Sequence, residues 1–350
     1  MKNVRAIRKS AVVAFAWTAA VGLALSIGLT CSVQAAEKEP GKSSELRKVT
    51  VAFVTVGGSS SILLITKDAG LFEKYGLDVQ PLYLPGVRSA QSLLSGDSHL
   101  AFISGRTVTT ANLGGADLVA IGSAVGTLVF SLYTPKEIQK LEELKGKSVA
   151  VTQIGGSADF AIRYGLKRVG LTADKDVTIF QTGGMPESLA ALQSRKIQGA
   201  VLSPPTTIKA GKLGLKELLD FSEMGLPYAQ AIIAVKKSYI ARNRETVDAF
   251  TKGLVEGIHY AKTHKEFSKK TIGKYIRSTD DAVLEDTYNI FLDKHLPRIP
   301  YVSEESIQTV LDEMAPQVPK VKEIKPAMYI DNGFLKKVVD SGFIKQLYGN

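Results

Sequence analysis

Two short runs of glycine and serine are the residues of this sequence best suited to hold a small ligand. They are Gly57-Gly58-Ser59-Ser60-Ser61 and Gly155-Gly156-Ser157. Glycine lets the backbone approach a ligand closely, and serine suits the N-cap of a following helix, whose free N–H groups bind acceptors. The pattern predicts two loops that grip one ligand with backbone N–H groups. The alternative is that both runs only make tight turns.

Each run lies where a predicted strand passes into a predicted helix. Residues 49–54 are β-branched and aromatic, as in a strand, and the helix expected after the first run ends at Gly76. Residues 148–152 form the corresponding strand before the second run. Gly57 and Gly155 are 98 positions apart, and the same offset recurs along both halves. A constant offset predicts two lobes built on one plan.

Strands and helices alternate in both halves, which predicts an α/β fold with a mostly parallel sheet in each lobe. Ligands of such sheets lie beyond the carboxyl ends of the strands. We therefore extend the candidate site to residues in the loops and crossings near those ends. These further candidates are Arg88, Gly105, Arg106, Gly184, Met185, Pro204 and Tyr228.

Three arginines close to the predicted loops could bind an anion. Arg88, Arg106 and Arg163 could each supply a charge-assisted donor, and Arg106 would open a helix at a strand end. The alternative for each is an ordinary surface arginine. The sequence alone leaves the identity of the ligand open.

Residue patterns that carry catalysis or hold a cofactor are absent from the sequence. It has no G-x-G-x-x-G, no P-loop and no G-x-S-x-G motif. The four histidines, His99, His259, His264 and His295, have no metal-site spacing. We therefore expect no catalytic residue, no metal and no cofactor. No dense Lys/Arg block is interleaved with aromatic residues, so nucleic acid is a poor partner.

The first 35 residues have the pattern of a signal peptide. Four basic residues precede an apolar run over residues 11–30, and Val33-Gln34-Ala35 suits cleavage before Ala36. An uncleaved membrane anchor is the alternative, because the apolar run is long. Cleavage would remove Cys31, the single cysteine, and lower the formal charge from +10 to 40 − 34 = +6. Residues 36–46 form a polar leader.

The expected lobes are discontinuous in the chain. Residues 47–134 and 227–350 form lobe 1, and residues 135–226 form lobe 2, with crossings near 129–135 and 226–234. From residue 237 onward the pattern changes to amphipathic helices, which we expect to pack on lobe 1.

One phrase in the first unit resembles a known family. Residues 68–79 read Asp-Ala-Gly-Leu-Phe-Glu-Lys-Tyr-Gly-Leu-Asp-Val. This resembles the A-x-x-x-G-L-F-x-K-x-G-L-D-V phrase in substrate-binding proteins of ABC importers, of the nitrate/sulfonate/taurine type. The specific motif covers this unit, and the chain matches the family in order and spacing from residue 47 to the end.

The resemblance implies a two-lobed periplasmic binding protein fold of type II. It implies an exported, monomeric receptor that captures a small molecule, an anion such as a sulfonate, nitrate or carboxylate, and delivers it to the permease of an ABC importer. Two alternatives use the same fold. One is an enzyme of the thiamine-pyrimidine or menaquinone-pathway type, and the other is an exported sensor domain. Export and the absence of catalytic clusters favour the receptor.

The signal-peptide interpretation gives a first testable prediction. The exported protein should be soluble and should begin near Ala36, because the cleavage site precedes this residue. N-terminal sequencing of the exported chain checks this. Recovery of a membrane-bound chain that still contains Trp17 would contradict it.

Overall fold

The computed structural model describes residues 45–349. The predicted signal peptide, residues 1–35, lies outside this range, as does most of the polar leader. Within the described range, no helix is both long and apolar enough to cross a membrane.

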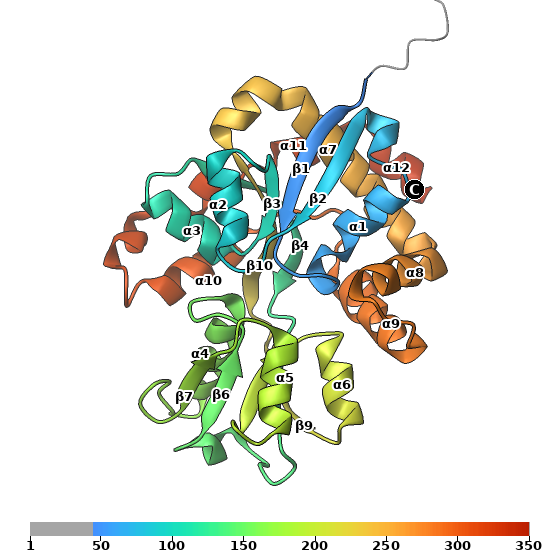
Figure 1. Cartoon of the computed structure of the whole chain (residues 1–350). Coiled ribbons are helices and arrows are strands. Elements are labelled where there is room, and N and C mark those ends of the chain that lie inside the picture. Colours follow the sequence, from blue (N-terminus) through green and yellow to red (C-terminus); the bar gives the residue numbers. More distant parts are fainter. Residues whose placement is uncertain (1–44, 350) are drawn as a thin grey trace, which may run out of the picture. The chain divides into compact units, whose positions relative to one another are not determined.

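Two five-stranded sheets form the centres of two lobes (Figure 1). The first sheet has the order β2 (Leu77–Tyr83), β1 (Arg47–Phe53), β3 (Leu100–Ile103), β10 (Pro227–Lys236) and β4 (Leu118–Thr127). The second sheet has the order β7 (Thr178–Gln181), β6 (Ser148–Val151), β8 (Gly199–Leu202), β5 (Ser131–Thr134) and β9 (Lys216–Asp220). Equivalent strands occupy equivalent places, as the repeated pattern in the sequence predicts.

One strand in each sheet runs against the others. β10 is antiparallel to β3 and β4, and β5 is antiparallel to β8 and β9. The remaining strands of each sheet share one direction, so the predicted mostly parallel sheets are confirmed. β5 and β10 are the first strands after the two crossings. Each therefore enters its sheet from the side of the other lobe, which reverses its direction.

The lobe boundaries at residues 135 and 226 stay predictions. β5 already belongs to the second sheet at Ser131–Thr134, and β10 returns to the first sheet at Pro227. The chain thus passes between the sheets immediately before β5 and immediately before β10.

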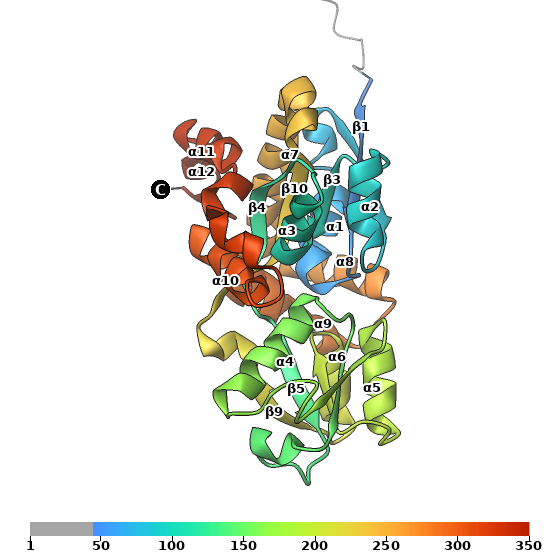
Figure 2. The same cartoon turned by 90° about the vertical axis from the view of Figure 1, so that its left-hand side faces the viewer.

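Helices cover both faces of the first sheet. Its N-terminal helices are α1 (Ser61–Asp68), α2 (Arg88–Ser95) and α3 (Gly105–Leu113). The C-terminal helices are α7 (Lys237–Thr263), α8 (Lys265–Ile276), α9 (Asp281–Tyr288), the π-helical η5 (Asn289–His295), α10 (Glu304–Met314), α11 (Gly333–Asp340) and α12 (Phe343–Tyr348). Figure 2 shows α10 beside α3. The expected packing of C-terminal helices on lobe 1 is confirmed.

The second lobe has fewer covering helices. They are α4 (Ser157–Arg168), α5 (Met185–Gln193) and α6 (Thr206–Lys212). Short 3₁₀ helices complete the chain, and two of them matter for the site, η1 (Gly58–Ser60) and η4 (Phe221–Met224).

Alternation along β1 explains why helices lie on both faces of its sheet. Val49, Val51 and Phe53 join one buried cluster with α1 and α7, whereas Ala52 joins a second cluster with α10. Successive side chains of a strand point to opposite faces, so both faces of β1 are apolar and both are covered.

The crossing of α1 and α7 depends on a glycine. A Cβ atom added at Gly257 would lie 1.9 Å from Oγ1 of Thr66. Thr66 is fully buried, and its hydroxyl donates to the carbonyl of Ile62 at 2.7 Å. The threonine therefore has no room to move away.

This contact gives a stability prediction. Gly257→Ala should lower the free energy of unfolding by about 1–3 kcal/mol, because overpacking forces the helices apart. The matched control is Gly211→Ala in α6, where an added Cβ meets no atom within 4 Å. There alanine should be neutral or stabilising by up to about 1 kcal/mol. Denaturant unfolding of both variants checks this, and equal stabilities would contradict it.

Candidate functional site

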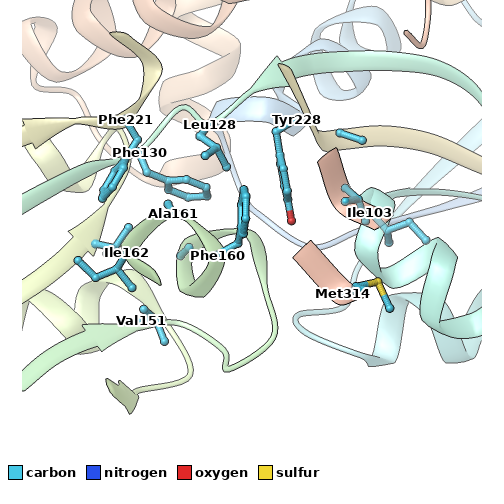
Figure 3. Close-up of a cluster of buried hydrophobic side chains, with 14 of the residues drawn as sticks. Ile103, Leu128, Phe130, Val151, Phe160, Ala161, Ile162, Phe221, Tyr228 and Met314 are labelled. Carbon is cyan, nitrogen blue, oxygen red and sulfur yellow. The ribbon is translucent and has the colours of Figure 1, made fainter. Parts of the chain in front are cut away.

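A cluster of buried hydrophobic side chains continues from one lobe to the other. It contains Ile103 at the end of β3, Leu128 in the first crossing, Tyr228 on β10, and Val151 and Phe160 of the second lobe. Figure 3 shows the ring of Phe160 beside the ring of Tyr228. The two rings are stacked with centroids 4.7 Å apart. The carboxyl ends of the strands therefore meet around the crossings.

The first glycine loop packs against C-terminal helices. Gly57 and Gly58 both have positive φ, 81° and 54°. An added Cβ would lie 2.6 Å from Cγ2 of Ile276 at Gly57, and 3.0 Å from Cε2 of Phe291 at Gly58. These glycines are needed for the turn and for packing. Substituting Gly58 would therefore cost stability as well as any binding.

Serine hydroxyls near this loop lack hydrogen-bond partners. Ser60, Ser61 and Ser123 are 1%, 1% and 3% exposed, and their Oγ atoms have no partner among the described residues. Ser123 lies on β4, against which η1 packs. Buried hydroxyls without partners cost free energy, so they favour a polar group of a ligand here. Placement of Ser59 and Ser60 in the site stays a prediction.

The second glycine loop uses its amides internally. The N–H of Gly155 donates to Oδ2 of Asp159 at 2.8 Å, and the N–H of Gly156 donates to the carbonyl of Gln153 at 3.1 Å. These two amides therefore do not grip a ligand in this arrangement. A carboxylate in the first turn of α4 takes the place that we expected a ligand to occupy.

Arg106 of α3 lies beside this loop, in a buried ion pair. Its Nη1 is 2.5 Å from Oε1 of Glu313 on α10, and the two side chains are 16% and 11% exposed. The hydroxyl of Tyr228, which is fully buried, donates to Oε2 of Glu313 at 3.1 Å. A Cβ added at Gly155 would lie 3.5 Å from the guanidinium of Arg106. Two predicted site residues, Arg106 and Tyr228, thus meet around one unpredicted carboxylate, and a third, Gly155, lies beside Arg106.

The carboxylate of Glu313 is in an unusual electrostatic environment. Burial raises the pKa of Glu313 to about 7, and this effect exceeds the opposing effect of the Arg106 guanidinium and the Tyr228 hydroxyl. The pKa of Tyr228 is raised well above its usual value, first by burial and then by Glu313. Burial therefore disfavours the charged forms of the Glu313 carboxyl and of the Tyr228 hydroxyl.

In the described part of the chain, Arg163, Arg88 and Gly105 form no hydrogen bond or ion pair with Glu313. Arg163 pairs with Asp159 and Asp174, both at 2.7 Å. Arg88 is exposed at the start of α2. An added Cβ at Gly105 would lie 2.7 Å from Cβ of Ala229, so this glycine serves close packing.

The loops of the second lobe contact one another. Gly184 precedes α5, and the sulfur of Met185 accepts from the N–H and the hydroxyl of Ser203, at 3.3 and 3.1 Å. Ser157 begins α4. The structure thus brings Arg106, Gly155 and Tyr228 together, and the side chain of Ser157 also hydrogen-bonds with Tyr228.

A cavity of about 470 Å³ lies between the lobes. The second lobe contributes Pro204 and Thr207 around the start of α6, Tyr133 on β5, and residues of β9. The first lobe contributes residues of α9 and η5, including Ile290. We call this space the interlobe cavity. Pro204 is the only one of our predicted site residues that lines it.

Sequence reasoning missed most of the residues that matter here. Glu313 looks like any charged residue of an amphipathic helix, and Phe160 looks like a core position of α4. Tyr133, Thr207 and Asp286 lie in three distant segments that only the fold joins. One sequence signal for this region was the first crossing, because an apolar run ends there in polar residues.

The raised pKa of Glu313 predicts a pH-dependent stability. Its carboxyl binds more protons in the folded than in the unfolded protein between pH 4.5 and about 7. The wild type should therefore lose stability relative to Glu313→Gln as the pH rises through this window, by up to roughly 3 kcal/mol. Denaturant unfolding of both proteins across the window measures this difference.

The matched control is Glu305→Gln on the exposed side of the same helix. Its difference from the wild type should not change with the pH between those limits. A constant difference for Glu313→Gln as well would contradict the buried, protonatable carboxyl.

Proteins of other organisms that are similar to this chain are named as binding proteins. It is 25% identical over 289 residues to a binding protein of Bacillus subtilis, YtlA, covering 79% of this chain and 85% of the relative. It is 29% identical over 273 residues to a binding protein of Brucella abortus, covering 75% and 80%. A relative from Brachyspira hyodysenteriae is named as an ABC transporter periplasmic binding protein and is 21% identical over 257 residues, covering 69% and 72%.

Solved structures have the same fold. The periplasmic nitrate-binding protein NrtA of Synechocystis matches with a TM-score of 0.70 at 15% identity, covering 85% of this chain and 89% of that chain. The periplasmic aliphatic sulphonate-binding protein SsuA of Escherichia coli matches at 0.67 and 18%, covering 81% and 92%. A variant of DszB, in complex with biphenyl-2-sulfinic acid, matches at 0.63 and 12%.

The model of the family described as "NMT1/THI5 like" matches residues 59–267. This range begins in the first serine loop, after β1, and ends in α8, so it includes both crossings, the whole second sheet and four of the five strands of the first sheet. The chain therefore belongs to the NMT1/THI5-like family and has the two-lobed fold of type II periplasmic binding proteins.

Proposed function

We propose that this protein is an exported solute-binding protein, which captures a small molecule between its two lobes and delivers it to an ABC importer. The interlobe cavity is the observation that carries the proposal. Its volume of about 470 Å³ is in the range of small-molecule sites. Both lobes line it, so a solute there would contact both. The names of the relatives support the same function.

Two ion pairs link the lobes beside the cavity. Lys212 of α6 pairs with Asp280 at the start of α9, and Lys294 of η5 pairs with Glu223 of η4 at 2.5 Å. These pairs join the lobes beside the cavity, but all four side chains are 43% to 65% exposed. Exposed pairs contribute little stability, so a bound solute would supply most of the free energy that holds the lobes together beside the cavity.

The arginines give little support to the anionic ligand that we expected. Arg106 and Arg163 are each paired with carboxylates. Arg88 has no such partner among the described residues, but it is exposed. A sulfonate, nitrate or carboxylate would have to compete with Glu313 for Arg106. The ligand class is therefore better argued from the cavity itself.

An enzyme on the same fold is the alternative, and DszB is a neighbour whose structure holds a sulfinic acid. In the described part of the chain, no three His, Cys, Asp or Glu side chains are placed to hold a metal ion. The relatives with significant sequence identity are named as binding proteins. We therefore favour the receptor.

The proposed function predicts a bound solute and a closing motion. Native mass spectrometry of the exported protein, purified from its host, should detect one small molecule per chain. Small-angle scattering should give a smaller radius of gyration with that molecule than without it, because the lobes close. Deletion of the gene should reduce uptake of the same molecule. An unchanged uptake, together with turnover of the molecule by the purified protein, would favour the enzyme.

A further inference from the structure

We propose that the interlobe cavity binds an organic cation, a solute with a primary ammonium group on a short apolar skeleton. The inference rests on the proposed function, because it names the chemical class of the solute that the lobes enclose.

Three carboxylates line the cavity without a cationic partner. Glu217 and Asp220 come from β9 of the second lobe, and Asp286 comes from α9 of the first lobe. None of the three has an ion pair among the residues that the structure describes. Since the acids come from both lobes, a cation between them would draw the lobes together.

All three carboxylates act on Tyr133, and Glu217 lies nearest to it. The hydroxyl of Tyr133 lies 3.4 Å from Oε2 of Glu217. The pKa of Tyr133 is raised above its usual value, first by burial and then by Glu217, Asp220 and Asp286. All three acids therefore contribute negative potential at the same tyrosine, which lines the cavity.

The lysines of the cavity do not cancel this charge. Lys212 and Lys294 line it, but each already pairs with a carboxylate of the other lobe, Asp280 or Glu223, that is not part of the lining. Burial and then Lys294 lower the pKa of His295, against the opposing effects of Asp220 and Glu223, which disfavours its charged form. Among the described residues that line the cavity, the three carboxylates are the acids without an ion pair, although Asp220 also acts to raise the pKa values of Lys294 and His295.

The rest of the lining fits a short organic skeleton. Val129, Phe130 and Ile290 supply apolar surface. Thr207 is 7% exposed, and its Oγ1 has no hydrogen-bond partner in the described chain. A buried hydroxyl without a partner favours a polar group on the occupant of the same cavity.

The placement of the acids favours an organic cation over a metal ion. A metal ion needs ligand atoms that converge within about 2–2.6 Å of one centre. Within the described range, no three acidic or imidazole groups are placed in that way. An ammonium group with several N–H donors can satisfy acids that lie farther apart.

A matched set of four-carbon compounds tests the charge of the ligand. Calorimetric titration should detect binding of putrescine, whereas butanediol and succinate should bind at least about tenfold more weakly, because only the diamine satisfies the acids. Tighter binding of succinate or butanediol, or no binding of putrescine, would overturn the proposal.

Two variants test whether putrescine binds in the interlobe cavity. Asp286→Asn should weaken putrescine binding about tenfold, since it removes one charge that faces the ammonium group. Glu142→Gln removes an equal charge from the surface of the second lobe, outside the lining, and should leave the affinity unchanged. Asp286 is exposed, and thermal melts should confirm that both variants fold. Equal affinities of the two variants would count against the cavity as the site.

A solute library separates this inference from the proposed function. A neutral or anionic solute that stabilises the protein, with the same affinity for Asp286→Asn, would overturn the cation site and leave the solute receptor intact. If no solute stabilises the protein and deletion leaves all uptake unchanged, the proposed function fails as well.

Discussion

The burial of Tyr228 is the constraint on which the arrangement between the lobes depends. A fully buried phenol needs an acceptor for its hydroxyl, since an unpaired one costs about 1–3 kcal/mol. Glu313 is that acceptor, and a buried carboxylate in turn needs a cation or a proton, which Arg106 or a raised pKa supplies. The three residues come from β10, α10 and α3. Satisfying one hydroxyl therefore fixes a crossing strand and a C-terminal helix against the first lobe.

The second lobe meets this group through α4. Phe160 stacks on Tyr228, and Gly155 brings the loop before α4 beside Arg106. The contacts between the lobes near Tyr228 are buried, whereas those beside the cavity are exposed ion pairs. The two lobes are thus held firmly near Tyr228 and weakly around the interlobe cavity. That difference in strength is what a hinged receptor needs, because the weak side can open for a solute.

Charge is distributed unevenly between the same two regions. Near Tyr228 the cations Arg106 and Arg163 are matched by carboxylates, so little free positive charge remains. In the cavity the balance is reversed, because the two lysines are paired, whereas three acids have no ion pair with any residue that the structure describes. Proteins named for nitrate and sulphonate binding share this fold. In this chain the acids without an ion pair on the cavity lining, among the described residues, are the opposite of what an anion would favour. A shared fold does not by itself fix the ligand, because binding depends on the side chains that the fold carries.

The alternation of strands and helices, the two equivalent halves and the C-terminal helices could all be predicted from the sequence. These follow from periodicity and turn residues, which are local properties. The sequence also located the glycine loops, but it assigned their amides to a ligand. Only the tertiary structure showed that Gly58 packs on Phe291 and that Gly155 donates to Asp159. The role of Glu313 and the cavity acids depended on contacts between segments far apart in the chain. Whether a glycine or a carboxylate faces a ligand, a helix or another charge is decided by which distant segments meet, and local sequence does not show which segments meet.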